Sequence, residues 1–322
     1  MSERDVMLAV DTVFPILPDQ GQQEWIFQAE AANDPSGLLT FPSRQWVRID
    51  VYIDFDARNV QVRSVEVKLV KGDVRDAALV EKVVRDTEIV FHLAAQVHVD
   101  RSCVEPDLTW DTNVMGTQRV LDAARMHDVR RVVLASSSEV YGSALYAPID
   151  ERHPLQAPHP YGASKIAADR MAYAYTITYG MDIAIMRLFN VFGPRQRDVG
   201  YGGVISIFTR RVLMGVPPMI YGSGLQTRDY TYVSDAVRAY DAALRYDGRL
   251  DGPVNFGAGR EISISTLAAM IIDLCGRNGT VDPVHVDARI GEVQRLIADA
   301  TRARQLFGWE PETDFRTGLR SF

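Results

Sequence analysis

The sequence predicts an α/β fold: a doubly wound parallel sheet with a smaller, discontinuous C-terminal lobe. From about residue 65, short apolar runs alternate with longer amphipathic segments. Strands that alternate with helices imply parallel pairing. Beyond Gly193 this alternation loosens. A chain of 322 residues can bury a large core. We expect a main domain over residues 1–185 and a lobe mainly over 186–322, with some of its segments returning to the main sheet.

The main domain is expected to alternate between strands and helices. Each expected strand is a short apolar run. Strands are expected over 65–70, 88–95, 130–138 and 181–193. The helices between them are expected over 72–86, 109–128 and 161–180. Active groups in such sheets gather at the carboxyl ends of strands, so the residues after each strand are candidates for a site.

The C-terminal lobe is expected to have shorter and less regular elements. A loop leads into a helix over 194–208. A short strand, a turn and another helix are expected over 217–244. Two further helices are expected over 262–275 and 298–311, the second ended by Gly308.

The first 60 residues are atypical for this fold. Residues 5–12 can form an opening strand, but no glycine-rich turn occurs anywhere in the first 60 residues. A dinucleotide-binding fold has such a turn after its first strand, where backbone amides and a helix N-terminus approach the pyrophosphate. Either a pyrophosphate is held differently here, or dinucleotide binding is weak or lost.

The composition excludes several classes of protein. A formal net charge of −7 argues against a nucleic-acid partner, which normally requires a basic surface. No apolar run is long enough to cross a bilayer, and the N-terminus lacks the pattern of a secretory signal. The two cysteines, Cys103 and Cys275, form neither a metal-ligand cluster nor a disulfide framework. We therefore expect a soluble cytoplasmic protein with no metal site and no membrane partner.

The segment HPYGASK, residues 159–165, places Tyr161 and Lys165 one helical turn apart. A tyrosine has a pKa of about 10, too high for a base near neutrality. A lysine one turn along a helix can favour the phenolate by its charge. The spacing alone also fits a surface pair. The expected strand 130–138 makes the Tyr161–Lys165 pair more specific as a sign of a catalytic site. This strand ends in serines whose hydroxyls could hydrogen-bond the same substrate oxygen.

Nine segments in a fixed order give the chain a resemblance to a known family. They are KGDVRD, VFHLAAQ, NVMGTQRVLDAAR, SSSEVYG, PYGASK, LFNVFGPRQ, GSGLQTRDYTYVSD, NFGAG and RIGEVQRLIADATRARQLFGWEP. From about Val65 to the C-terminus, the chain resembles the extended short-chain dehydrogenase/reductases that act on nucleotide sugars, the epimerase/dehydratase family. The resemblance implies a Rossmann-like NAD-binding domain, a substrate-binding lobe and a nucleotide-sugar substrate.

The resemblance also implies roles for individual residues. Tyr161 would be the catalytic base, Lys165 would orient the nicotinamide ribose and lower the pKa of the tyrosine, and Ser137 would be the hydroxyl partner. Asp73 would meet the adenine of NAD; the sequence leaves NADP open as well. The implied cofactor contacts are Asp73, Val74, Ala94, Ala95, Asn113, Tyr161 and Lys165. The implied substrate contacts are Ser138, Asn190, Arg228, Arg289 and Glu292.

The family's members share a first step, the oxidation of sugar carbon-4, and differ in the second. In a 4,6-dehydratase a carboxylate then removes the carbon-5 proton, and Glu139 stands where dehydratases have that carboxylate. Burial would raise the pKa of Glu139 and suit it to proton transfer. We expect an NDP-hexose 4,6-dehydratase. An NDP-hexose 4-epimerase, for example of UDP-glucose, is the alternative, and a cofactor-deficient pseudoenzyme is a further one.

The resemblance finally implies a homodimer. Relatives pair two helices from each subunit into a four-helix bundle. In this chain the helices beginning near Thr109 and Tyr161 would supply them.

Overall fold

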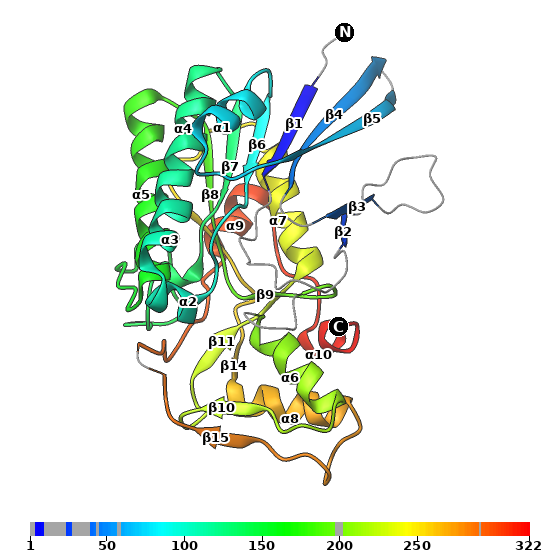
Figure 1. Cartoon of the computed structure of the whole chain (residues 1–322), viewed down its shortest axis with the longest axis vertical. Helices are drawn as coiled ribbons and strands as arrows, with labels where there is room; N and C mark the ends of the chain where they lie inside the picture. Colours follow the sequence, from blue (N-terminus) through cyan, green and yellow to red (C-terminus); the bar gives the residue numbers. More distant parts are fainter. Residues whose placement is uncertain are drawn as a thin grey trace.

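The computed structural model describes residues 4–9, 24–27, 39–42, 45–56, 59–196, 202–289 and 291–322, with side chains described at Val70 and from Gly72 onward. In this part of the chain the central sheet has the strand order β13-β8-β7-β6-β1-β4-β5 (Figure 1). Its strands are β1 (Arg4–Ala9), β4 (Gln45–Asp56), β5 (Asn59–Lys71), β6 (Ile89–His92), β7 (Arg131–Ala135), β8 (Ile183–Leu188) and β13 (Val254–Phe256).

Most of the sheet is parallel, as the alternation of strands and helices predicts. The strands β1, β6, β7, β8 and β13 pair in parallel. The exception is β4, which pairs antiparallel with both β1 and β5. The connection between β4 and β5 is too short for a parallel crossover, which needs about a dozen residues or more, so these two strands pair antiparallel. Elsewhere near the N-terminus, β2 (Glu24–Phe27) and β3 (Leu39–Pro42) form a separate antiparallel pair.

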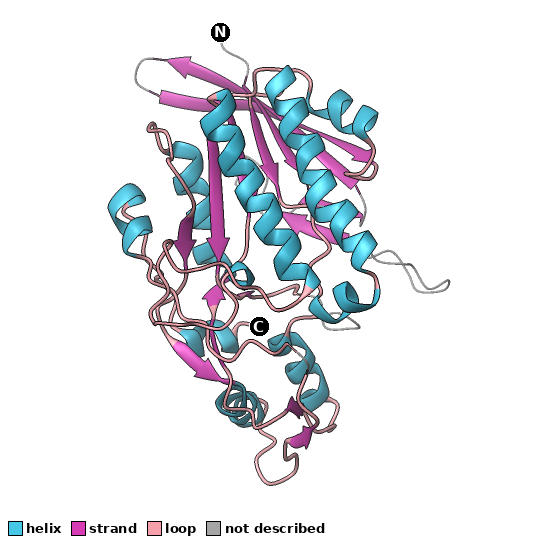
Figure 2. Ribbon diagram, turned by 90° about the vertical axis from the view of Figure 1, so that its left-hand side faces the viewer, coloured by secondary structure: helices cyan, strands magenta, loops and turns pink. Residues whose placement is uncertain are grey.

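Helices cover both faces of the sheet, which makes it doubly wound. One layer contains α1 (Ala77–Val84), α4 (Gly116–Met126) and α5 (Pro160–Tyr179), and Figure 2 shows this layer in front of the sheet. Its buried side chains form one apolar core with those of the sheet. On the other face, α7 (Val233–Arg245) and α9 (Thr301–Phe307) pack on a second core. Strand β13, α7 and α9 all come after residue 186 in the chain, yet they lie against the main sheet.

The helix α5 begins and ends where its sequence indicates. The side chain of His159 caps its N-terminus, Pro160 occupies the first turn, and Gly180 ends it with a φ of 69°. Proline suits a first turn because the N–H that it lacks would have no helical partner there. The expected helix over 161–180 is confirmed to within one residue at each end.

The helix predicted over 109–128 forms, but with an irregular turn inside it. The chain is helical from α3 (Pro106–Trp110) through a wide π-helical turn over Asp111–Met115 to the end of α4 at Met126, and a separate short helix, α2 (Val99–Val104), precedes it. A 3₁₀ turn over Ser138–Val140 comes after β7.

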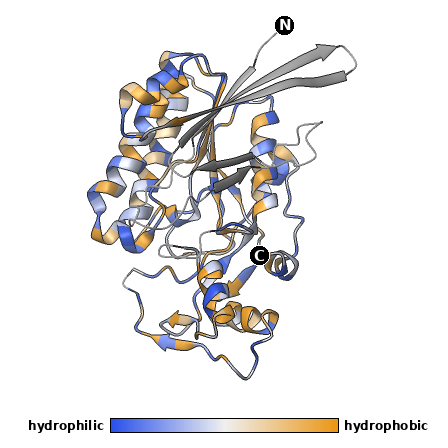
Figure 3. Cartoon of the chain, turned by 45° about the vertical axis from the view of Figure 1, so that its right-hand side comes forward, coloured by the Kyte–Doolittle hydropathy of each residue, from blue (hydrophilic) through white to orange (hydrophobic). Residues whose placement is uncertain are grey.

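The lobe consists of short elements around a third apolar core. Figure 3 shows that its helix α8 contains mostly hydrophobic residues. The helices of the lobe are α6 (Val204–Leu213), α8 (Ile264–Leu274) and α10 (Phe315–Arg320). Its strands pair as β10 (Met219–Tyr221) with β15 (Val284–Val286), β11 (Thr227–Asp229) with β14 (Glu261–Ser263), and β9 (Val191–Phe192) with β12 (Thr231–Tyr232). Among the helices of the described residues, none combines the length and apolar character that a membrane span requires.

Candidate functional site

Four predicted catalytic residues come from two adjacent elements. Ser137 and Glu139 lie just beyond the carboxyl end of β7, and Tyr161 and Lys165 lie in the first turns of α5. Gly162 allows these elements to approach, because a Cβ at this position would lie 2.9 Å from the backbone oxygen of Glu139. The site therefore lies at the edge of the sheet where doubly wound folds bind ligands.

The phenol of Tyr161 is buried beside Ser137. The tyrosine is 7% exposed. Burial raises the pKa of Tyr161 to about 12; a hydrogen bond with the Ser137 side chain opposes the rise and the charge of Glu139 adds to it. The hydroxyl of Ser137 thus lies within hydrogen-bonding reach of the phenol.

The ammonium group of Lys165 contacts the backbone of β7. Its Nζ donates a hydrogen bond to the carbonyl oxygen of Ala135 at 2.9 Å. Burial lowers the pKa of Lys165 to about 8, against the opposing charge of Asp169. The expectation that Lys165 lowers the pKa of Tyr161 is wrong for this structure, because desolvation of the phenol dominates and its pKa rises.

Glu139 is held as a carboxylate rather than as a carboxylic acid. Its Oε2 lies 3.2 Å from Nε2 of His159. Burial raises the pKa of Glu139, but the hydrogen bond with His159 and the positive charge of Arg228 outweigh it, so this pKa lies below its usual value. The predicted rise in the pKa of Glu139 is therefore wrong. Desolvation acts as expected, but the sequence pattern does not reveal the two opposing partners.

A cavity of about 480 Å³ opens between the sheet edge and the lobe. It brings together five predicted residues from distant parts of the chain. These are Glu139, Asn190, Arg228, Arg289 and Glu292. Ser138 does not join them: it is 2% exposed and is not among the residues that line the cavity.

The polar groups of this cavity suit a charged ligand. Arg228 donates through Nη2 to Glu292 at 3.0 Å and through Nη1 to the Val293 carbonyl at 2.7 Å. The buried Nδ2 of Asn190 has no hydrogen-bond partner in the described part of the chain. A buried amide without a partner is costly, so it marks a place for a ligand acceptor.

Arg289 is placed by a charged group and an aromatic ring. Its Nη2 lies 3.3 Å from a carboxylate oxygen of Asp100, and its guanidinium carbon lies 4.0 Å from the ring centroid of Tyr221. Tyr221 also lines the cavity. Sequence reasoning missed Tyr221 and His159; the only available signals were the neighbouring GSGLQ segment and the position of His159 directly before the Pro160 of α5.

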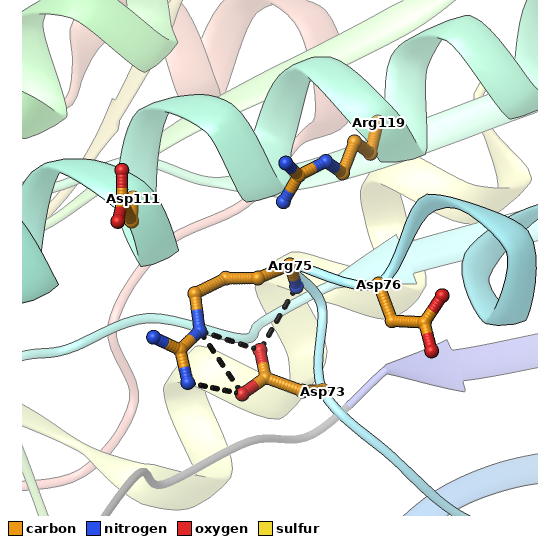
Figure 4. Close-up of a pocket in the computed structure, with 5 residues that line it drawn as sticks. All are labelled: Asp73, Arg75, Asp76, Asp111 and Arg119. Atoms are coloured by element: carbon orange, nitrogen blue, oxygen red, sulfur yellow. Dashed lines mark hydrogen bonds and ion pairs between the residues drawn. The ribbon is translucent and has the colours of Figure 1, made fainter.

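A second cavity, of about 400 Å³, surrounds the predicted adenine site (Figure 4). It is lined by Asp73, Arg75, Asp76, Asp111 and Arg119. The Asp73 carboxylate accepts hydrogen bonds from Nε and Nη2 of Arg75. That side-chain hydrogen bond outweighs partial burial and holds the pKa of Asp73 below its usual value.

The other predicted cofactor residues on this side of the site, Val74, Ala94, Ala95 and Asn113, are buried and are not among the residues that line this cavity. Val74 is fully buried against Gly116, where a Cβ would lie 2.6 Å from its Cγ1. Ala94 and Ala95 are buried just after β6. Asn113 accepts a hydrogen bond from the Gln96 N–H at 2.7 Å and donates to Ser164 Oγ at 2.9 Å, so it ties this segment to α5.

The residues present fit a dinucleotide at its adenosine and nicotinamide ends. Asp73 offers acceptor oxygens beside a cavity, and the Lys165 ammonium lies at the end of β7, where it is bonded to the Ala135 carbonyl. The segment where a glycine-rich turn would hold the pyrophosphate, residues 10–23, lies outside the described residues. The described residues contain no group of three or more His, Cys, Asp or Glu side chains able to hold a metal ion.

Comparison with known proteins agrees with this arrangement. The sequence model for GDP-mannose 4,6 dehydratase matches residues 52–322. A putative UDP-glucose 4-epimerase of Methanocaldococcus jannaschii is 39% identical over 255 residues, which cover 79% of this chain and 82% of that protein.

Two solved structures share the fold. The UDP-glucose 4-epimerase of Thermotoga maritima, solved with UDP-glucose, has a TM-score of 0.74 at 32% identity and covers 78% of this chain and 81% of that one. DesIV, the dTDP-glucose 4,6-dehydratase of Streptomyces venezuelae solved with NAD and TYD, has a TM-score of 0.73 at 34% identity, with coverages of 78% and 76%. This chain therefore belongs to the extended short-chain dehydrogenase/reductase family of NAD-dependent nucleotide-sugar epimerases and dehydratases.

Proposed function

We propose that this protein is an NAD-dependent NDP-hexose 4,6-dehydratase. The observation that carries the proposal is the carboxylate of Glu139, which lines the substrate cavity two residues after Ser137. An epimerase that only inverts carbon-4 has no use for a second base there. A dehydratase needs a carboxylate at this place to remove the carbon-5 proton.

The first step uses Tyr161 and Ser137. The Ser137 hydroxyl orients the carbon-4 hydroxyl of the sugar, and Tyr161 accepts its proton. Bound NAD would take the carbon-4 hydride and later return it to carbon-6. Lys165 would hold the nicotinamide ribose.

The second step uses Glu139. The carbon-4 ketone acidifies the carbon-5 hydrogen, and the Glu139 carboxylate removes it as a proton. Ser138 offers no carboxylic acid, so the same proton passes from Glu139 to the carbon-6 hydroxyl, which leaves as water. One residue thus acts as base and then as acid. When hydride returns to carbon-6, carbon-5 takes up a proton from solvent, so the net change is the loss of one water molecule.

The cavity would hold the nucleotide part of the substrate. Arg228 and Arg289 provide guanidinium groups for the diphosphate, since a planar fork matches phosphate oxygens. Glu292 would accept from ribose hydroxyls, and the unpaired Asn190 amide would donate to a phosphate or sugar oxygen. The adenosine of NAD would lie in the cavity beside Asp73.

A 4-epimerase remains the second candidate, because the Methanocaldococcus jannaschii and Thermotoga maritima relatives carry that name. Ser138 also stands where one dehydratase subgroup has an acid. Incubation with a panel of nucleotide hexoses in D₂O separates the two by NMR. A 4-keto-6-deoxy product with deuterium at carbon-5 supports the dehydratase. A carbon-4 epimer without solvent deuterium would instead show that the protein is a 4-epimerase. Failure of NAD to co-purify or bind would point to a pseudoenzyme.

We also propose that the protein is a homodimer joined through the outer face of α3 and α5. Tyr173 and Ile177 on α5 are 36% and 63% exposed, and Trp110 at the end of α3 is 47% exposed. Large exposed apolar side chains on adjacent helices favour burial against a partner. A second copy of the chain presents the same surface, so a symmetric four-helix arrangement would cover both.

A further inference from the structure

His159 makes two hydrogen bonds that lead to different parts of the site. Its Nδ1 accepts from the backbone N–H of Gly162 at 3.0 Å, which caps α5. Its Nε2 lies 3.2 Å from Oε2 of Glu139. The imidazole is buried, with a side-chain exposure of 4%. A single ring therefore joins the first turn of α5 to the turn after β7.

The cap determines which nitrogen of His159 carries the proton. A nitrogen that accepts from a backbone N–H has no hydrogen of its own, so Nδ1 is unprotonated. The proton of the neutral ring then lies on Nε2, which must donate to Glu139. A second proton on Nδ1 would break the cap and would add positive charge at the positive end of the helix dipole. The geometry thus makes Nε2 of His159 the donor to the Glu139 carboxylate.

The ring of His159 is also placed relative to Tyr161. The two ring centroids are 6.0 Å apart, with planes inclined by 14°. Gly162 gives the imidazole the space it occupies, because a Cβ there would lie 3.1 Å from Cε1 of His159. The phenol, the imidazole and the Glu139 carboxylate are therefore positioned by one packed unit.

We propose that His159 is a positioning residue that fixes the Glu139 carboxylate relative to Tyr161 and keeps it ready to accept a proton. The use of Glu139 at carbon-5 rests on the proposed function, whereas the way in which Glu139 is held does not. Tyr161 acts on carbon-4 and Glu139 on the adjacent carbon-5. A fixed link between their supporting elements would keep both groups in register with neighbouring atoms of one sugar.

Other ionisable groups around Glu139 do not replace this link. Arg228 lowers the pKa of Glu139 by its charge, but it is bonded to Glu292 and to the Val293 carbonyl. Tyr161 faces Glu139 with a phenol whose pKa is raised. The remaining ionisable side chains that line the cavity are His98 and Asp100 of α2, Arg211 of α6, Tyr221, Arg289 and Glu292.

The test separates the cap from the link to Glu139. Serine and asparagine both cap helices well, but neither can reach Glu139 as the imidazole does. The His159→Ser and His159→Asn variants should therefore fold with nearly unchanged thermal stability. If one of these two variants fails to fold, the other is used for the measurements. Asp314 is the matched control, because its side chain also caps a helix, α10, through the Thr317 N–H at 3.0 Å, and it is not among the residues that line the cavity.

The first measurement is an NMR titration of protein labelled with ¹³C at the glutamate carboxyls, with the Glu139 signal assigned by its loss in Glu139→Gln. The pKa of Glu139 should rise in His159→Ser and should not change in Asp314→Ser. An unchanged pKa in both His159 variants would overturn the inference. This titration needs no substrate, so its outcome is independent of the proposed function.

The second measurement monitors turnover in D₂O. Deuterium incorporation at carbon-5 should slow by about tenfold or more in His159→Ser, as expected for loss of a hydrogen bond to a charged group. In the pH profile of this deuterium incorporation, the acid limb should move to higher pH in His159→Ser. The single-turnover reduction of NAD, which reports carbon-4 oxidation, should change by less than about threefold. In Glu139→Gln, the additional His159→Ser change should have little further effect on elimination.

The outcomes separate the two proposals. Equal losses in both steps, with no movement of the acid limb, would show that His159 only supports the helix and would overturn the inference. A wild-type protein that makes a carbon-4 epimer without carbon-5 deuterium would overturn the dehydratase. The titration alone would then decide how Glu139 is held.

Discussion

The ammonium group of Lys165 donates to the carbonyl oxygen of Ala135 at 2.9 Å, so a charged group lies buried at the end of β7. Burial lowers its pKa from 10.5 to about 8. Between these values the unfolded chain binds a proton that the folded protein does not. Burying the charged lysine therefore destabilises the fold below pH 8, and this cost disappears as the pH rises toward 10.5.

Replacing Lys165 by methionine should consequently stabilise the protein while removing its activity. The free energy of unfolding at pH 7 should increase by about 1–3 kcal/mol, because a methionine carries no charge to desolvate. The advantage should shrink above about pH 9, where the wild-type lysine is neutral in the fold. Denaturant unfolding at several pH values measures both effects. Lys82→Met, on the exposed surface of α1, is the control and should change little.

The hydroxyl of Ser137 should control how readily Tyr161 gives up its proton. A hydrogen bond with Ser137 opposes the effect of burial on the phenol, so Ser137→Ala should raise the pKa of Tyr161 further. The rate of carbon-4 oxidation should fall by about 10- to 100-fold, the scale of lost proton-transfer assistance. The pH at which this oxidation rate rises should also become more alkaline in Ser137→Ala. Single-turnover reduction of NAD measures the rate, and Tyr161→Phe should abolish it. An unchanged rate in Ser137→Ala would contradict the assigned partnership.

The place of the proposed catalytic residues in the fold could be predicted because they lie next to regular elements of the chain. Ser137 and Glu139 come directly after β7, and Tyr161 begins α5, whose cap and terminal glycine are visible in the sequence. Once parallel strands are inferred, their carboxyl ends must meet at one edge of the sheet. This topological rule accounts for the place of Ser137 and Glu139, whereas Arg228 on the antiparallel pair β11–β14 and Arg289 after β15 belong to the lobe and do not follow from it.

The electrostatics of the site could not be predicted in the same way. The pKa of Glu139 depends on His159 and Arg228, which lie at other places in the sequence, and their combined effect reverses the expected direction. Likewise, Lys165 contacts Ala135 because of how α5 packs on β7. The antiparallel direction of β4 could not be predicted either, because an apolar run indicates a strand but not the direction of its partner strand.

The buried ion pair beneath the site should be important for stability. Arg187 donates through Nε and Nη2 to both carboxylate oxygens of Asp169 at 2.9 Å, and neither side chain is more than 1% exposed. Arg187→Met should lower the free energy of unfolding by about 3–5 kcal/mol, because it leaves a buried carboxylate without its main partner. Adding Asp169→Asn should recover part of the loss. Denaturant titration measures each step; losses that simply add would argue against a coupled pair.

The proposed dimer can be tested at one exposed position of α5. Ile177→Asp places a charge on the apolar surface that a second copy would cover. The mass in solution should fall from twice the chain mass of 36.0 kDa to that of a monomer, while the fold is retained. Light scattering and sedimentation measure the mass. Val284→Asp is the control, because Val284 is 47% exposed on β15 in the other lobe. A wild-type protein that is already monomeric, or loss of the dimer in both variants, would refute the proposed interface.

Arg289 offers a test of the substrate cavity that is independent of whether the enzyme eliminates water or inverts carbon-4. Its guanidinium stacks on Tyr221 and pairs with Asp100, so it is held in place before a diphosphate arrives. Arg289→Met should weaken nucleotide-sugar binding by about 10- to 100-fold, the scale of one lost charge-assisted contact. Arg289→Lys should recover only part of the affinity, because an ammonium neither stacks on a ring in the same way nor contacts phosphate bidentately. Calorimetry with the nucleoside diphosphate alone isolates this contribution. Arg316→Met, which removes an exposed partner of Asp273 on α8, should leave the affinity unchanged. Equal affinities for the wild type and Arg289→Met would place the diphosphate elsewhere.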